Sequence, residues 1–145
     1  GVAAYVSIHI NHLQELSDET KAAARLMADA GIALVSQTVL LNGVNNSVEA
    51  LADLFETLTE NRIRPYYLHH PDLAPGTSHF RVSVEEGQAL YDAVRDRVSG
   101  LSVPRYVIDI PGGVSKANAA RSDLRETSDG PALRGRDGQL HPYKT

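Results

Sequence analysis

The stretch "RPYYLHHPDLAPGTSHFRV", residues 64–82, decides the fold of this chain. It begins as an apolar, aromatic run typical of a buried strand and then collects three histidines, an aspartate and a Pro-Gly turn. A polar cluster placed where a strand ends and a helix begins has three explanations. It forms a metal site, a substrate site or an ordinary capped turn.

Working outward from this stretch, four apolar runs alternate with three amphipathic helical patterns. The order β-α-β-α-β-α-β predicts an α/β fold with parallel strands joined by right-handed crossovers. One run, "IALVSQTVLL", is apolar enough to predict a strand covered on both faces. These units fit either an open doubly wound sheet or part of a TIM-like barrel. Four strands cannot close a barrel of eight, so the second alternative implies further chain. The predicted strands are residues 2–10, 32–41, 63–70 and 104–110.

Capping residues and a change of composition set the boundaries of these elements. The predicted helix caps are Ser17, the capping-box pair Asn46 and Glu49, and the capping-box pair Ser83 and Glu86. After Lys116 the chain is polar and arginine-rich, without a strong period. We therefore expect a (β/α) domain over residues 1–116, followed by an irregular tail over residues 117–145.

Composition narrows the class of protein. A net charge of −4 argues against nucleic acid and anionic membranes as partners, and no apolar run reaches the ~20 residues that span a bilayer. The absence of cysteine excludes disulfides and cysteine-bound iron–sulfur clusters within these residues. A cytoplasmic location is the default expectation. Because the sequence enters a strand at once without an initiator Met, we expect a piece of a longer protein.

A metal site is the first reading of the histidines. His9 and His12 flank one strand end, and His69, His70 and Asp72 follow another, as in zinc sites of barrel hydrolases. Adjacent residues of a strand point to opposite faces, however, so His69 and His70 cannot both enter one site without a bend. This disfavours a dedicated metal site.

Two aspartates suggest a cation site instead. Asp72 precedes a Pro-Gly turn and could simply cap its own backbone. Asp109 lies inside the apolar run "YVIDI" and needs a cation there, which could be Arg105, Arg64 or a ligand. Two carboxylates at neighbouring strand ends suit an ammonium group.

The turn "PGGVSK" follows the last predicted strand and ends in Lys116. It does not match a Walker A loop. Lys116 is either an ordinary surface lysine or a lysine brought into the site, where it could form a Schiff base. Gln37, a polar residue within an apolar strand, is either a satisfied interior residue or a ligand contact.

Four segments together resemble the lysine 2,3-aminomutases of the radical S-adenosylmethionine superfamily. They are "HINHLQEL", "GIALVSQTVLLNGVN", "RIRPYYLHHPDLAPGTSHFR" and "SGLSVPRYVIDIPGGVSK". The resemblance covers nearly all of the chain up to Lys116. The C-x-x-x-C-x-x-C radical motif of that family is not among these residues, so the chain resembles the C-terminal half of such an enzyme and of its partial TIM-like barrel.

The resemblance implies an enzyme that converts L-lysine to β-lysine with pyridoxal 5′-phosphate, S-adenosylmethionine and a [4Fe–4S] cluster. The ligands of that cluster lie in the N-terminal half of the family, so no metal ligand is expected here. By matching position, Lys116 forms the internal aldimine with pyridoxal phosphate, and Asp72 and Asp109 bind the distal ammonium of lysine. Residues that line the cofactor region are His9, Gln37, Asn11 and Tyr66. We expect a homo-oligomer for the full-length protein and no activity for these residues alone.

The chain also departs from the family. The tail "KANAARSDLRETSDG" differs from the usual continuation, which leaves its docking open, and His69 and His70 receive no catalytic role. Two anionic anchors argue against glutamate as the substrate. The alternatives are the related branch that makes β-lysine for modifying elongation factor P, which the intact "DIPGG" disfavours, and a metal-dependent barrel hydrolase or lyase.

Overall fold

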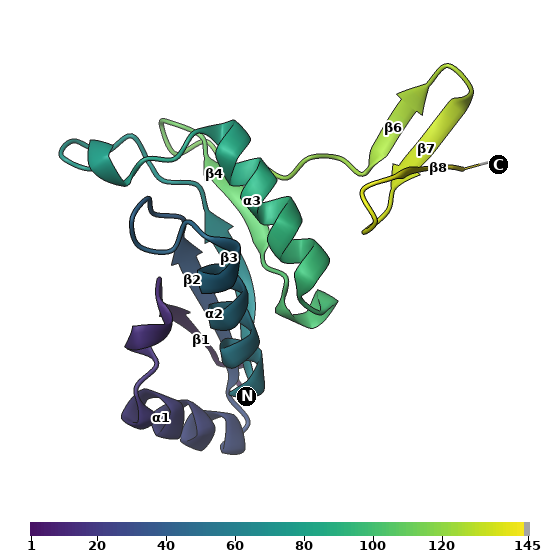
Figure 1. The fold of residues 1–145 in the computed structure, drawn as a ribbon. Helices are drawn as coiled ribbons and strands as arrows, with labels where there is room; N and C mark the ends of the chain where they lie inside the picture. Colours follow the sequence, from purple (N-terminus) through teal and green to yellow (C-terminus); the bar gives the residue numbers. More distant parts are fainter. Residues whose placement is uncertain (144–145) are drawn as a thin grey trace.

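The computed structural model of this α/β protein describes residues 1–143 (Figure 1). The four predicted strands and three predicted helices are confirmed in their order. None of the helices in the described part is long and apolar enough to cross a bilayer. The elements of this part are β1 (Tyr5–His9), α1 (Asp18–Asp29), β2 (Ala33–Val39), α2 (Val48–Glu60), β3 (Ile63–His69), α3 (Val84–Arg97) and β4 (Arg105–Asp109).

The main sheet has the strand order β1-β2-β3-β4-β5, in which the first four strands are parallel. β5 (Lys116–Asn118) returns antiparallel to β4, so the sheet is mixed. Strands are added in sequence order without a reversal, which differs from a doubly wound sheet. Right-handed crossovers that always step in the same direction place all three helices on one face of the sheet (Figure 1).

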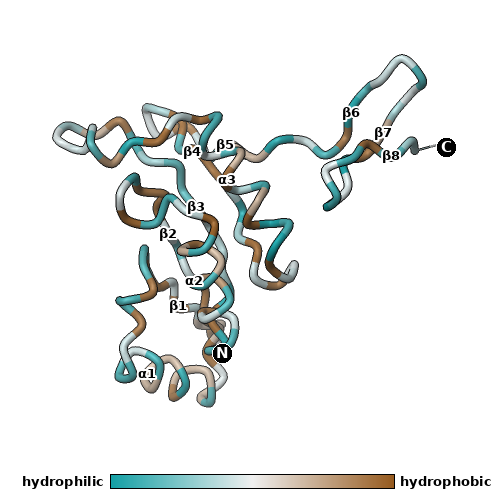
Figure 2. The backbone as a smooth tube through the Cα atoms, viewed as in Figure 1, coloured by the Kyte–Doolittle hydropathy of each residue, from teal (hydrophilic) through white to brown (hydrophobic). Residues whose placement is uncertain are grey.

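A single apolar core lies between this face and the helices, and its members come from all three helices and the four parallel strands. Hydrophobic residues recur along the strands and helices that bound it (Figure 2). In β2, Leu34, Ser36 and Thr38 are buried toward the helices, whereas Val35 and Gln37 are only partly buried. The prediction that β2 is covered on both faces was therefore wrong, because the described helices cover only one.

A β-bulge in β3 sets the orientation of the residues that follow it. Ser36 of β2 is opposite Pro65, but Gln37 is opposite Tyr67, so Tyr66 has no partner in the register. An extra residue on one strand reverses the alternation of side chains beyond it. As a result Leu68 is buried among the helices and His69 faces the open side of the sheet.

Serine side chains cap all three helices. Ser17 accepts a hydrogen bond from Thr20 N, and Ser83 with Glu86 forms a complete capping box, as predicted. The predicted box of Asn46 and Glu49 was wrong. Ser47 caps α2 instead, and Asn46 accepts a hydrogen bond from Gly43 N in the preceding turn.

The prediction of an irregular tail was also wrong. Residues after Asn118 form a three-stranded antiparallel sheet of β6 (Leu124–Thr127), β7 (Gly130–Arg134) and β8 (Leu140–Pro142). Two ion pairs fasten this sheet and its approach to α3. Arg95 contacts Asp123 through two hydrogen bonds of 2.8 Å each, and Arg134 contacts Asp96 at 3.0 Å.

Candidate functional site

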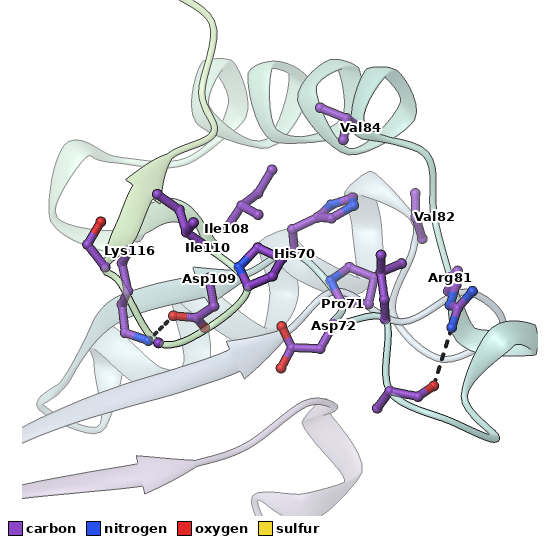
Figure 3. Close-up of a pocket in the computed structure, with 15 residues that line it drawn as sticks. His70, Pro71, Asp72, Arg81, Val82, Val84, Ile108, Asp109, Ile110 and Lys116 are labelled. Atoms are coloured by element: carbon purple, nitrogen blue, oxygen red, sulfur yellow. Dashed lines mark hydrogen bonds and ion pairs between the residues drawn. The ribbon is translucent and has the colours of Figure 1, made fainter.

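A pocket of about 880 Å³ opens beyond the carboxyl ends of β3 and β4 (Figure 3). Its walls are the loop after β3, the start of α3 and the turn between β4 and β5. Parallel strands present the residues after their carboxyl ends at one edge of the sheet, which explains why segments 40 residues apart meet here. The pocket combines apolar walls, formed by Leu73, Val84 and Ile110 among others, with a few charged groups.

Asp109, the last residue of β4, is the most strongly held of these groups. Its Oδ1 accepts a hydrogen bond from Lys116 Nζ at 2.5 Å, and its Oδ2 lies 3.2 Å from His69 Nδ1. The Lys116 contact lowers the pKa of Asp109 below its ordinary value; burial opposes this shift, and the contact with His69 adds to it. Arg105, Arg64 or a ligand was expected to supply a cation for Asp109, and neither arginine pairs with it. Arg64 donates to backbone carbonyls, and Arg105 lies over the Tyr67 ring.

Lys116 is brought back to Asp109 by a tight turn. Gly112 and Gly113 adopt positive φ angles of 88° and 73°, which other residues rarely tolerate. β5 then pairs with β4 so that Lys116 lies opposite Asp109. The Lys116 side chain is 40% exposed, and its Nζ lies 6.0 Å from the centre of the Tyr67 ring. Of the two predicted readings, the structure favours a lysine held at the pocket over one free on the surface.

Asp72 enters the pocket from the loop after β3. Its carboxylate points toward the side where Asp109 and Lys116 lie (Figure 3). The alternative that Asp72 caps its own backbone is not realised, since no hydrogen bond to its carboxylate forms among residues 1–143. Asp72, Asp109 and Lys116 thus line one pocket, with two carboxylates and one ammonium.

Comparison with known proteins identifies relatives with aminomutase names. Over 112 residues the chain is 43% identical to an L-lysine 2,3-aminomutase of Fusobacterium nucleatum, covering 77% of this chain and 26% of that protein. Over 140 residues it is 36% identical to the L-lysine 2,3-aminomutase of Clostridium subterminale, covering 96% and 34%. The chain belongs to the lysine 2,3-aminomutase family. It spans about a quarter to a third of the length of these two relatives.

The same family includes proteins with another named substrate. A glutamate 2,3-aminomutase of Clostridioides difficile is 37% identical over 112 residues, covering 77% of this chain and 26% of the relative. No protein-family model matches the chain. Identity to the lysine aminomutases, at 43% and 36%, and to the glutamate aminomutase, at 37%, is similar and does not separate the two groups of relatives.

The residues that the aminomutase resemblance assigns to the cofactor region lie outside this pocket. His9 and Gln37 are opposite one another in the β1–β2 register and face the open side of the sheet. Asn11 accepts a hydrogen bond from Val39 N and so holds the ends of β1 and β2 together. Tyr66, the bulge residue, is 42% exposed. Their roles toward a cofactor stay predictions.

Two histidines that received no role are both engaged. His69 lies between Gln37 Oε1, at 3.0 Å from its Nε2, and Asp109. His70, which lines the pocket, turns to the other side, where its Nδ1 lies 2.7 Å from the hydroxyl of the fully buried Tyr106. The expectation that the two rings point apart is confirmed. One sequence signal could have found His69. It lies toward the carboxyl end of its strand, as Gln37 and Asp109 do in the two neighbouring strands.

The His70–Tyr106 contact has a defined direction. Burial lowers the pKa of His70 and raises the pKa of Tyr106 to about 12. At neutral pH a neutral imidazole therefore accepts the hydrogen bond that the Tyr106 hydroxyl donates. Gly87 of α3 allows this arrangement, because a Cβ there would lie 2.0 Å from the Tyr106 oxygen.

The metal candidates do not assemble. His12 caps a short 3-10 helix (Leu13–Glu15) by accepting from Gln14 N. Within the described residues no group of three or more His, Asp or Glu side chains is placed to hold a metal ion.

The pocket has features that a pyridoxal phosphate site would need. It has a lysine amine at its edge, apolar walls and a volume within the range of small-molecule sites. A [4Fe–4S] cluster has no cysteine to bind here, so these residues do not hold one.

Proposed function

We propose that the full-length protein that carries this sequence is an L-lysine 2,3-aminomutase. It uses pyridoxal phosphate and S-adenosylmethionine to move the α-amino group of lysine to Cβ, giving β-lysine by radical chemistry. The observation that carries the proposal is that Asp72, Asp109 and Lys116 line one pocket. The sequential parallel strands, with helices on one face only, support a partial TIM-like barrel as the scaffold.

Lys116 is the residue that would hold pyridoxal phosphate, and that cofactor supplies the stabilisation of charge and unpaired electrons at the migrating nitrogen. The chain itself supplies binding and orientation. Apolar side chains such as Leu73 and Ile110 line the pocket beside the substrate, and the two carboxylates anchor its far end. Anchoring the distal group fixes the position of the reacting carbons relative to the cofactor.

The pocket also favours lysine over glutamate. The Lys116 ammonium already rests on Asp109 in this structure, which shows that an alkylammonium fits against that carboxylate. Hydrogen bonds between charged groups contribute about 1.5–3 kcal/mol. A glutamate side chain in the same place would bring a third carboxylate to Asp72 and Asp109, and like charges repel.

The proposal is tested on the full-length protein by adding pyridoxal phosphate and recording the visible absorption of the lysine-bound form. We expect this absorption to disappear in Lys116→Ala and to persist in Lys21→Ala, a matched change on α1. With L-lysine as substrate, Asp72→Asn and Asp109→Asn should each raise KM by about tenfold or more. Unchanged cofactor absorption in Lys116→Ala, or faster turnover of L-glutamate than of L-lysine, would refute the proposal.

A further inference from the structure

His69 is held at both ring nitrogens, although no role follows for it from the resemblance to the family. Nε2 lies 3.0 Å from Gln37 Oε1, and Nδ1 lies 3.2 Å from Asp109 Oδ2. Gln37 is in turn fixed by the hydrogen bond that its Nε2 donates to Ser7 Oγ at 3.0 Å. A chain of contacts therefore runs from β1 across β2 and β3 to the carboxylate at the end of β4.

The direction of these hydrogen bonds follows from the Asp109 carboxylate at one end of the chain of contacts. An ionised carboxylate only accepts, so His69 Nδ1 must carry a hydrogen and donate it to Asp109. Gln37 can offer either its oxygen or, after turning its amide, its nitrogen to Nε2. The contact with Asp109 is thus satisfied in either protonation state of the ring.

The two oxygens of Asp109 have partners of different character. Lys116 on Oδ1 is 40% exposed and extends from a turn, whereas His69 on Oδ2 is 12% exposed and lies within a strand. Lys116 can therefore be replaced by another cation at Oδ1, whereas His69 is fixed at Oδ2. If Lys116 holds a cofactor, Oδ1 is released for another cation while Oδ2 remains bound to His69.

We infer that His69 is a positioning residue, which holds Asp109 so that its free oxygen faces the cationic end of the ligand. His69 does not touch the ligand itself and acts through Asp109. The inference rests on the proposed function, since it assumes that the pocket takes an amino acid with a distal ammonium. It adds to that function a residue that, by holding Asp109 in place, makes the site prefer a ligand with a distal ammonium.

The test compares two ligands that differ only in this charge. L-Lysine and L-norleucine share the α-amino acid group and the aliphatic chain, but norleucine lacks the terminal ammonium. Isothermal titration calorimetry of the full-length protein gives the dissociation constant of each ligand, and their ratio isolates the contribution of the distal ammonium. Any reaction of the α-amino group with the cofactor is common to both ligands and cancels in the ratio.

Two substitutions separate positioning from packing. His69→Asn places its amide nitrogen near the position of Nδ1 and can still donate to Asp109, whereas His69→Gln places it near Nε2 and reaches Gln37 instead. We expect His69→Asn to keep the preference for lysine within about twofold, and His69→Gln and His69→Ala to reduce it about tenfold. Affinity for norleucine should change little in any of them. In an Asp109→Asn background, His69→Gln should have no further effect on the ratio.

The outcomes distinguish the two proposals. If the unsubstituted protein does not prefer lysine to norleucine, the proposed function fails and this inference fails with it. If it does prefer lysine but His69→Gln keeps the full preference, the proposed function stands and the role of His69 is refuted. Equal weakening of both ligands would also refute it, because that result indicates a general structural role.

Discussion

Gly87→Ala offers a sharp test of how the core is packed around Tyr106, the hydrogen-bond partner of the pocket residue His70. Gly87 lies within α3, where alanine is normally favoured over glycine by roughly 1 kcal/mol. The added Cβ, however, would lie 2.0 Å from the Tyr106 hydroxyl oxygen, 3.1 Å from Cζ of the same ring and 3.3 Å from Leu40 Cδ2. Tyr106 and Leu40 are fully buried, so neither can move away freely.

The expected change in stability follows from three contributions. Overpacking of a close-packed core costs about 1–3 kcal/mol. Loss of the hydrogen bond from Tyr106 to His70 costs about 1 kcal/mol more, and the helix propensity of alanine offsets about the same amount. Gly87→Ala should therefore lower the free energy of unfolding by about 1–3 kcal/mol.

Urea unfolding followed by circular dichroism measures this change, with two controls. Gly100→Ala adds a Cβ with no heavy atom within 4 Å and should change little. Combining Gly87→Ala with Tyr106→Phe removes the clashing oxygen, so the double variant should be less destabilised than the sum of the two single changes. If Gly87→Ala alone is as stable as the unsubstituted protein, or the two changes simply add, the packing account is wrong.

Three further predictions concern charge and caps. The pKa of Asp109 is lowered in the folded state, so its contribution to stability is present above its ordinary value of about 4 and is lost as pH falls through the lowered pKa. Acid unfolding curves of the unsubstituted protein and Asp109→Asn should therefore converge only at the most acidic pH. Asp123→Asn breaks the paired hydrogen bonds with Arg95 and should speed proteolysis between β5 and β6, whereas Asp129→Asn in the β6–β7 turn should not. Ser47→Ala should cost about 1 kcal/mol, while Glu49→Gln should stay within about 0.5 kcal/mol because Glu49 does not complete a capping box.

The sequence predicted the alternating core well because periodicity and capping signals agree there. Each strand of the parallel sheet is an apolar run, and two of the three helix caps, Ser17 and Ser83, were predicted at the residues that cap in the structure. The tail was missed because its strands are only three to five residues long, and β6 and β8 are largely exposed. Two Asp-Gly pairs, at 129–130 and 137–138, mark its hairpin turns and would have indicated the antiparallel sheet.

The candidate site was predictable only for residues whose positions relative to the strands are enough to place them. Asp72 follows β3, Asp109 ends β4 and Lys116 comes after the turn that follows β4, so topology alone brings them to one edge of the sheet. The partner of Asp109 was not predictable in this way. The sequence offered Arg105, Arg64 or a ligand as the cation for Asp109, but the chain returns through two glycines and supplies Lys116 from the following strand.

The role of His69 depends on a single unpaired residue. In an unbroken strand starting at Ile63, which faces the helices, every second residue would share that face, and His69 would turn into the core while Leu68 faced outward. Tyr66 interrupts this alternation, because Gln37 pairs with Tyr67 after Ser36 has paired with Pro65. Pro65 has no backbone N–H to donate, and proline within a sheet is found at edges and bulges. The bulge buries Leu68 and turns His69 toward Gln37 and Asp109. A pattern read at period two through this segment cannot locate the bulge, and so it assigns His69 and Leu68 to the wrong faces.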